Sequence, residues 1–183
     1  FGVRWLFIHN LGQDYLGVNS VMESMLMILS MTELGIGTSV AFALYKPIDE
    51  GDEKRIGSLM AFYRKVYHAI GILTAVVGPF LLPFMHFFTK EAVDVGNLNL
   101  IYLLFLLNTV LSYFFAYKRT LLNAYQQSYV NSASEDLFAV VKYILQAFVL
   151  IYYKSYIGYI IINIVCAVGA NLVISVVCDK KYP

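Results

Sequence analysis

Four ionisable residues lie within or at the ends of long apolar stretches of this sequence, where their charge could act on a ligand. They are Arg4, Glu23, Glu33 and Lys142. An ionisable side chain is costly at the centre of a bilayer, so it normally faces a bundle interior or an aqueous cavity. Two cations facing one cavity, here Arg4 and Lys142, would attract an anionic ligand. For Glu23, a depth near the membrane surface explains the charge equally well.

Polar residues also align along three of these apolar stretches. At 100° per residue, one helix face within an arc of about 80° holds Asn19, Glu23, Ser30, Glu33 and Gly37. A second face holds Glu135, Lys142, Gln146 and Tyr153, and a third holds Asn108 and Ser112, in line with Arg119. Such faces either line a hydrated cavity or join helices by hydrogen bonds and ion pairs. Packing is the favoured interpretation for the Asn and Ser residues.

Motifs of enzymes are absent from the sequence. His9, His68 and His86 have no partner at metal-ligand spacing, and there is no phosphate-binding loop or nucleophile motif. Helix capping is sufficient to explain the adjacent carboxylates Glu135 and Asp136. We therefore expect no catalytic residue, no metal site and no cofactor. The formal net charge of +1 gives no basic field that would indicate a nucleic-acid partner.

The composition indicates a surface that is not mainly wetted by water. Hydrophobic residues make up 60% of the chain, charged residues make up 14%, and the mean hydropathy is +0.68. A soluble domain carries about 25% charged residues.

Five apolar runs approach or exceed the length that a helix needs to span a bilayer, about 20 residues. They cover residues 18–45, 66–88, 98–117, 137–153 and 156–178, and residues 1–8 resemble the end of a sixth. The predicted fold is an all-α polytopic membrane protein with five complete transmembrane helices. Since the chain starts at Phe1 within an apolar run, we expect it to be a fragment.

The basic residues between these runs predict the orientation. One side holds nine of them, and the other holds only Lys90 and Lys154. The nine are Lys46, Lys54, Arg55, Arg64, Lys65, Lys118, Arg119, Lys180 and Lys181. The positive-inside rule places the nine in the cytoplasm, so we predict a multi-pass protein of the inner (cytoplasmic) membrane with connector 46–65 inside.

Local signals predict how the helices begin and end. Pro47 should end the first long span at Lys46. Residues 53–65 have an amphipathic pattern, which predicts a helix lying at the interface before the chain turns into the membrane. Pro79 and Pro83 should kink or loosen the following span. Gly35-Ile36-Gly37 permits close packing or a bend, with close packing favoured.

Several short strings, taken in order along the chain, resemble one family. They are residues 11–17, Ser30 with 33–37, 44–47, 52–56 with 59–60, 105–110 with 112–114, 117–119 and 180–183. This set is similar to the polysaccharide-biosynthesis flippases of the multidrug/oligosaccharidyl-lipid/polysaccharide exporter superfamily. Each string alone is weakly specific, and the second lobe of such proteins is absent from this sequence.

The resemblance implies most of the first of two six-helix lobes around a central cavity. The implied substrate is an oligosaccharide on polyprenyl pyrophosphate, moved from the cytoplasmic to the outer leaflet. Arg4, with Lys142 as a second candidate, would hold the anionic pyrophosphate. Glu33 would respond to a coupling cation or neutralise a base, and glycan polymerases or glycosyltransferases are implied partners.

Two other functions remain open at this point. A drug or organic-cation antiporter of the same superfamily predicts an acidic cavity without facing bases. A non-transporting membrane scaffold of a glycan-assembly complex predicts polar faces that close on each other. Besides Arg4, Lys142 and Glu33, the residues proposed for a cavity are Asn19, Asn108 and Gln146.

Overall fold

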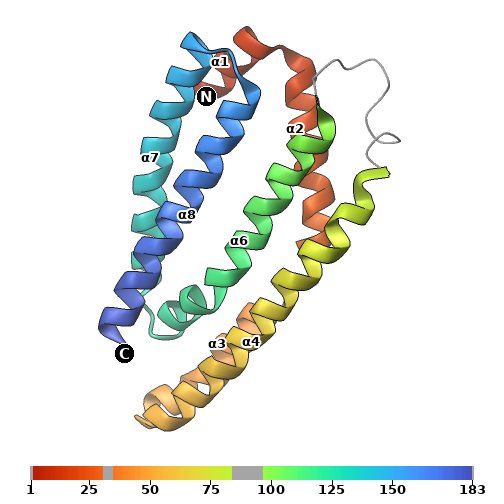
Figure 1. Cartoon of the computed structure of the whole chain (residues 1–183). Helices are drawn as coiled ribbons and strands as arrows, with labels where there is room; N and C mark the ends of the chain where they lie inside the picture. The colour runs from red at the N-terminus through yellow and green to blue at the C-terminus, as the bar shows by residue number, and fades with distance from the viewer. Residues whose placement is uncertain (1, 31–34, 84–96, 183) are drawn as a thin grey trace.

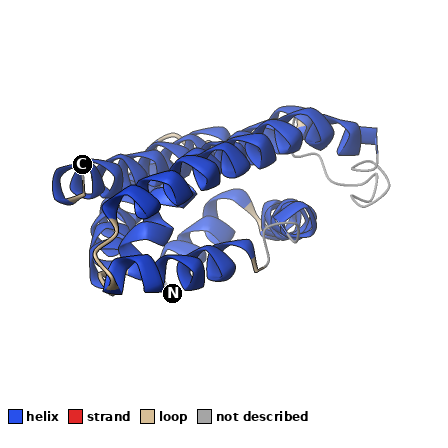
Figure 2. Ribbon diagram, turned by 90° about the horizontal axis from the view of Figure 1, so that it is seen from below, coloured by secondary structure: helices blue, strands red, loops and turns tan. Residues whose placement is uncertain are grey.

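A computed structural model describes residues 2–30, 35–83 and 97–182, and the side chains from residue 4 onward apart from 28–30. Within these ranges the chain is helical and contains no strand, which confirms the predicted all-α class. The helices are α1 (Gly2–Leu11), α2 (Gln13–Ser30), α3 (Ile36–Asp49), α4 (Glu53–Val77), α6 (Leu98–Ala124), α7 (Ser128–Tyr152) and α8 (Tyr156–Lys181), with a 3-10 turn, η2 (Gly78–Leu81), after α4. Figure 2 shows the described chain as helices, with the α7–α8 and α6–α7 connections as short loops.

Polar side chains fix the first residue of three of the long helices. The Asp52 carboxylate accepts a hydrogen bond from the backbone N–H of Arg55, and the Asn97 side chain accepts one from that of Leu100. Ser155 does the same for the N–H of Gly158 at the start of α8. Each bond satisfies a backbone donor that the helix itself cannot, so these positions set the helix starts.

The helix α6 lies at the centre of the bundle and contacts α2, α3, α4, α7 and α8. The α3–α4 turn, the α6–α7 turn and the end of α8 lie at the lower end of the molecule in Figure 1, and the α7–α8 turn lies at the upper end. The nine basic residues of the predicted cytoplasmic side therefore gather at the lower end, while Lys154 lies at the upper end.

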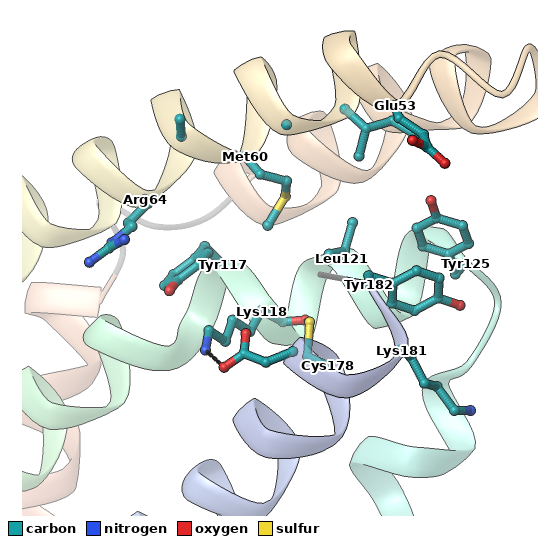
Figure 3. Close-up of a pocket in the computed structure, with 14 residues that line it drawn as sticks. Glu53, Met60, Arg64, Tyr117, Lys118, Leu121, Tyr125, Cys178, Lys181 and Tyr182 are labelled. Atoms are coloured by element: carbon teal, nitrogen blue, oxygen red, sulfur yellow. Dashed lines mark hydrogen bonds and ion pairs between the residues drawn. The ribbon is translucent and has the colours of Figure 1, made fainter.

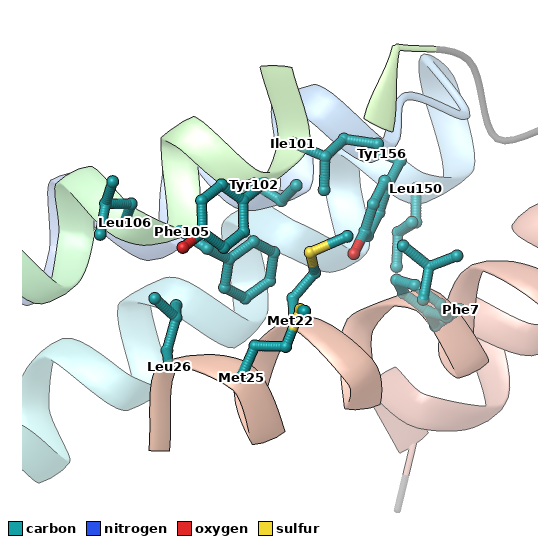
Figure 4. Close-up of a cluster of buried hydrophobic side chains, with 12 residues drawn as sticks. Phe7, Met22, Met25, Leu26, Ile101, Tyr102, Phe105, Leu106, Leu150 and Tyr156 are labelled. Carbon is teal, nitrogen blue, oxygen red and sulfur yellow. The ribbon is translucent and has the colours of Figure 1, made fainter. Parts of the chain in front are cut away.

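Two clusters of buried side chains hold the bundle together. The upper cluster combines Phe7 of α1, Met22 of α2, Tyr102 of α6 and Tyr156 of α8 with their neighbours (Figure 4). The lower cluster joins Leu44 of α3, Leu122 of α6 and Ile174 of α8, with neighbours on each of these helices. Helix α6 contributes to both, so it connects the two ends of the molecule.

The outer surface of the described bundle is unusually apolar. Thirty large hydrophobic side chains are exposed, among them Ile144 of α7 at 65%, Phe62 of α4 at 59% and Val165 of α8 at 62%. Contiguous apolar surface of this kind is normally covered by lipid or by another protein. By length and composition, two of the described helices, α6 and α8, could cross a membrane.

The first long apolar run does not form one helix. It is described as α2 and α3, and Gly35 precedes α3 with a left-handed φ of +95°. The predicted polar face from Asn19 to Gly37 is therefore wrong as a single face, because the helical phase does not continue through Gly35. Gly37 also allows close packing, since a Cβ there would lie 3.3 Å from the Tyr67 hydroxyl.

Two expectations about the connector are also wrong. Helix α3 continues through Pro47 to Asp49, because a proline in the last turn removes only one helical hydrogen bond. Helix α4 runs without interruption from Glu53 to Val77, so the amphipathic part and the next apolar run form one helix. At Pro79 the α-helix gives way to the 3-10 turn η2, in line with the kinked or loosened helix predicted there.

Gly78 allows η2 to pack against α6, which leads to a prediction about stability. A Cβ at residue 78 would lie 2.5 Å from Cδ1 of the buried Leu106, so Gly78→Ala should destabilise the fold by about 1–3 kcal/mol. Gly57→Ala is the matched control: it lies in α4 with no atom within 4 Å of the added Cβ, so it should leave stability unchanged or raise it by up to about 1 kcal/mol. Equilibrium unfolding followed by circular dichroism measures both, and equal effects would contradict the prediction.

Candidate functional site

Tyr156 connects α8 to α2 at the upper end of the bundle. Its hydroxyl donates to Oδ1 of Asn19 at 3.2 Å, and the Asn19 amide donates to Glu23 at 2.9 Å. The Tyr156 ring is 5% exposed and makes edge contacts with Phe7 and Tyr15. The predicted cavity residue Asn19 therefore takes part in a contact between helices.

Gln146 lies at the same end, buried between α7 and α8. Its side chain is 1% exposed, and Nε2 donates to the backbone carbonyl of Tyr159 at 3.3 Å. Oε1 of Gln146 has no hydrogen-bond partner among the described residues. The Tyr159 ring packs 5.0 Å from that of Phe7, so Gln146 and Asn19 border the same aromatic cluster. Both amides join helices there.

The predicted cations are not brought together by any described contact. Arg4 is exposed on α1, and neither Arg4 nor Lys142 takes part in a described salt bridge. Lys142 is half-buried on α7, with Nζ 5.2 Å from the centre of the Tyr143 ring. Asn108 is half-buried on α6, and Glu33 lies outside the described residues.

A polar strip remains exposed along α1 and α2. Ser20 and Ser24 are exposed, and their hydroxyls donate to the carbonyls of Leu16 and Ser20 within α2. Among the described side chains of the two helices, the exposed polar ones are Arg4, His9, Gln13, Asp14, Ser20, Glu23 and Ser24, and two large apolar ones, Trp5 (64%) and Met27 (67%), are also exposed. We call the polar set the α1–α2 polar strip. Large exposed hydrophobic side chains are more numerous on α4, α7 and α8 than on these two helices.

A polar contact between α6 and α7 was not predicted from the sequence. Arg119 forms an ion pair with Glu135, and Asn131 donates to the Arg119 carbonyl at 3.2 Å and to Asn123 at 2.9 Å. The interpretation of Glu135 and Asp136 as a cap is wrong, because α7 starts earlier, at Ser128. The turn between α6 and α7 is short, with Gln126 at φ 57°.

A groove at the lower end was also not predicted (Figure 3). It has a volume of about 680 Å³ and lies between α4 on one side and the ends of α6 and α8 on the other. Apolar residues from both sides line it, including Met60 and Leu121, and charged residues lie among them: Glu53, Arg64, Lys118, Asp179 and Lys181.

Hydrogen bonds, ion pairs and stacking fix one wall of this groove. Lys118 of α6 and Asp179 of α8 form an ion pair with an N–O distance of 2.6 Å. The rings of Tyr125 and Tyr182 stack with centres 3.9 Å apart. Burial raises the pKa of the Tyr125 hydroxyl, and the negative charge of Glu53 raises it further, so this tyrosine stays neutral at physiological pH.

Comparison of the chain with protein-family models, curated proteins and solved structures gives no match. In the described part of the chain, no group of three or more His, Cys, Asp or Glu residues is placed to hold a metal ion.

The bond between Tyr156 and Asn19 can be tested by removing one hydroxyl. Tyr156→Phe keeps the ring contacts and leaves Oδ1 of Asn19 without this donor, so the free energy of unfolding should fall by about 0.5–1.5 kcal/mol. Tyr152→Phe is the control, because Tyr152 is 72% exposed on α7. Denaturant unfolding of both variants measures the difference, and a Tyr156→Phe protein as stable as the control would contradict the contact.

Proposed function

We propose that this chain is most of one six-helix lobe of a flippase for lipid-linked oligosaccharides. Its substrate would be a polyprenyl-pyrophosphate-linked repeat unit, moved from the cytoplasmic to the outer leaflet of the inner membrane. The substrate class comes from the sequence resemblance. The observation that carries a transport function is the set of exposed polar residues along α1 and α2, since the exposed side chains of α7 after Asp136 and of α8 before Asp179 are largely apolar.

A membrane location explains the surface of the bundle. In this proposal α2 with α3, α4, α6, α7 and α8 provide five crossings, and α1 is the end of the preceding one. A helix rises about 1.5 Å per residue, so 25 residues reach about 37 Å, more than the hydrocarbon core needs. The exposed apolar side chains of α4, α7 and α8 would then face lipid.

In a membrane, the α1–α2 polar strip would have to face something other than lipid. Charged and polar side chains are costly against lipid, so such a strip faces either another part of the protein or a water-filled space. In a two-lobed flippase both would be present, a second lobe and the cavity between the lobes. Arg4, exposed on α1, is the cation of the strip best suited to an anionic pyrophosphate.

A non-transporting scaffold is the second candidate, and a specific observation favours it. Asn19 and Gln146, both proposed for a cavity, instead make hydrogen bonds between helices. A scaffold would use its polar residues in this way throughout. The exposure of Arg4 and of the serines on α2 favours the flippase.

Cysteine labelling tests the proposed orientation. Both native cysteines, Cys166 and Cys178, are buried, so a single introduced cysteine should dominate the reaction with a membrane-impermeant maleimide. Ser58→Cys, exposed on α4, should react only after the inner membrane is opened, and Lys154→Cys should react in spheroplasts. The reverse pattern would show that the topology is inverted.

Replacing both candidate cations, Arg4 and Lys142, tests the proposed transport function. Arg4→Ala with Lys142→Ala should lower export of surface glycan by at least about tenfold, because two attractive charges for the pyrophosphate are lost. Lys54→Gln, exposed at the lower end, is the control. Export is measured at matched protein levels, together with the lipid-linked repeat units that accumulate inside the cell.

The two functions give different results in this assay. A flippase defect leaves lipid-linked repeat units in the cytoplasmic leaflet, whereas unchanged export in the double variant would rule out the cationic cavity. Reduced export without accumulation of these units would favour the scaffold.

A further inference from the structure

We propose that the groove between α4 and the ends of α6 and α8 binds the phosphate headgroup of an anionic phospholipid of the inner leaflet. The site is separate from the α1–α2 polar strip, and its argument needs only that the bundle lies in a membrane. It would hold a resident lipid of the bilayer, distinct from a transported substrate.

Arg64 of α4 is the charge available to a ligand. Lys118 is paired with Asp179 at 2.6 Å, and Nζ of Lys181 donates to Gln127 at 2.8 Å. Arg64 is exposed and takes part in no described salt bridge, although it lines the groove. Its planar guanidinium can donate two parallel hydrogen bonds to a phosphate.

The charges along the groove are arranged unevenly. In Figure 3, Glu53 lies near the Tyr125 and Tyr182 rings at one end, while Arg64 lies at the other end near Tyr117. The negative charge of Glu53 acts on the Tyr125 hydroxyl, which raises its pKa. Lys181 lies at the Glu53 end as well, and Asp179 is paired with Lys118. Arg64 is therefore the groove cation that lies away from Glu53 and takes part in no described salt bridge, and the headgroup would sit at that end.

The apolar lining indicates that the anion carries acyl chains. Ile56, Met60 and Leu121 line the groove, and they would contribute nothing to the binding of a free phosphate ion. A diacyl phospholipid satisfies both requirements, with its phosphate at Arg64 and its chains along α4.

The position along the bundle agrees with this ligand. The groove lies at the end where the nine basic residues gather, which the positive-inside rule assigns to the cytoplasmic surface. Anionic lipids concentrate in that leaflet, and each basic residue near it contributes about 1 kcal/mol of attraction. Arg64 would add a direct hydrogen-bonded contact to this general attraction.

Adjacent residues of α4 provide a matched pair of variants. Arg64→Gln removes the groove cation, and Lys65→Gln removes an equal charge from the next residue, which is exposed but does not line the groove. Arg64→Lys keeps the charge without the planar fork. Circular dichroism in detergent should confirm that all three variants keep the helical content of the wild type.

Native mass spectrometry of the intact detergent-solubilised protein measures binding of the first phosphatidylglycerol and phosphatidylcholine molecules. We expect wild type to prefer phosphatidylglycerol, and Arg64→Gln to weaken its binding by at least about fivefold, corresponding to about 1 kcal/mol. Lys65→Gln should change it by less than about twofold at physiological salt, since exposed charges are screened. Arg64→Lys should recover part of the affinity.

Three results would overturn the proposal. Equal retention of the two lipids would show that the phosphate charge is not recognised. Equal losses in Arg64→Gln and Lys65→Gln would show general surface attraction without a site. Displacement of the lipid by inorganic phosphate alone would show that a free anion, with no acyl chains, is the preferred ligand. None of these results depends on glycan export, so the proposed flippase function stands or fails separately.

Discussion

The packing of α6 against five other helices is the constraint on which the rest of the bundle depends. Its buried residues belong to both hydrophobic clusters: Tyr102 lies in the upper one and Leu122 in the lower one. The close approach of Gly78 to Leu106, together with the hydrogen bond from the Tyr102 hydroxyl to the Gly78 carbonyl at 2.8 Å, holds the end of α4 against this helix. Because α6 is shared, a change in its position would affect both ends of the molecule.

Buried polar groups of the bundle are satisfied in more than one way. Asn131 and Gln146 bond to a neighbouring helix, since an unpaired polar group in an apolar interior costs about 1–3 kcal/mol, and Ser134 bonds back within its own helix. Where polar groups are exposed, as along α1 and α2, no described helix covers them. This contrast separates residues that hold the fold from residues that remain exposed.

Charged side chains at the basic end of the bundle are of two kinds, those in ion pairs and those without an ion-pair partner among the described residues. The ion pairs Lys118–Asp179 and Arg119–Glu135 tie helix ends together at the basic end, which leaves Arg64 available in the groove. The same end therefore combines fixed, neutralised charges with free ones. These pairs stabilise the arrangement of α6, α7 and α8, and Arg64 takes part in no described salt bridge.

The amino-acid sequence by itself determined the helical class, the apolar runs and the helix starts at Asn97 and Ser155. It also determined that basic residues gather on alternate connectors. All of these depend on local composition and spacing. Tertiary structure decided that Gly35 separates α2 from α3, that Asn19 bonds to Tyr156, and that a groove lies beside Arg64. These features depend on which faces of distant helices meet. Periodicity along one helix contains no information about such partners.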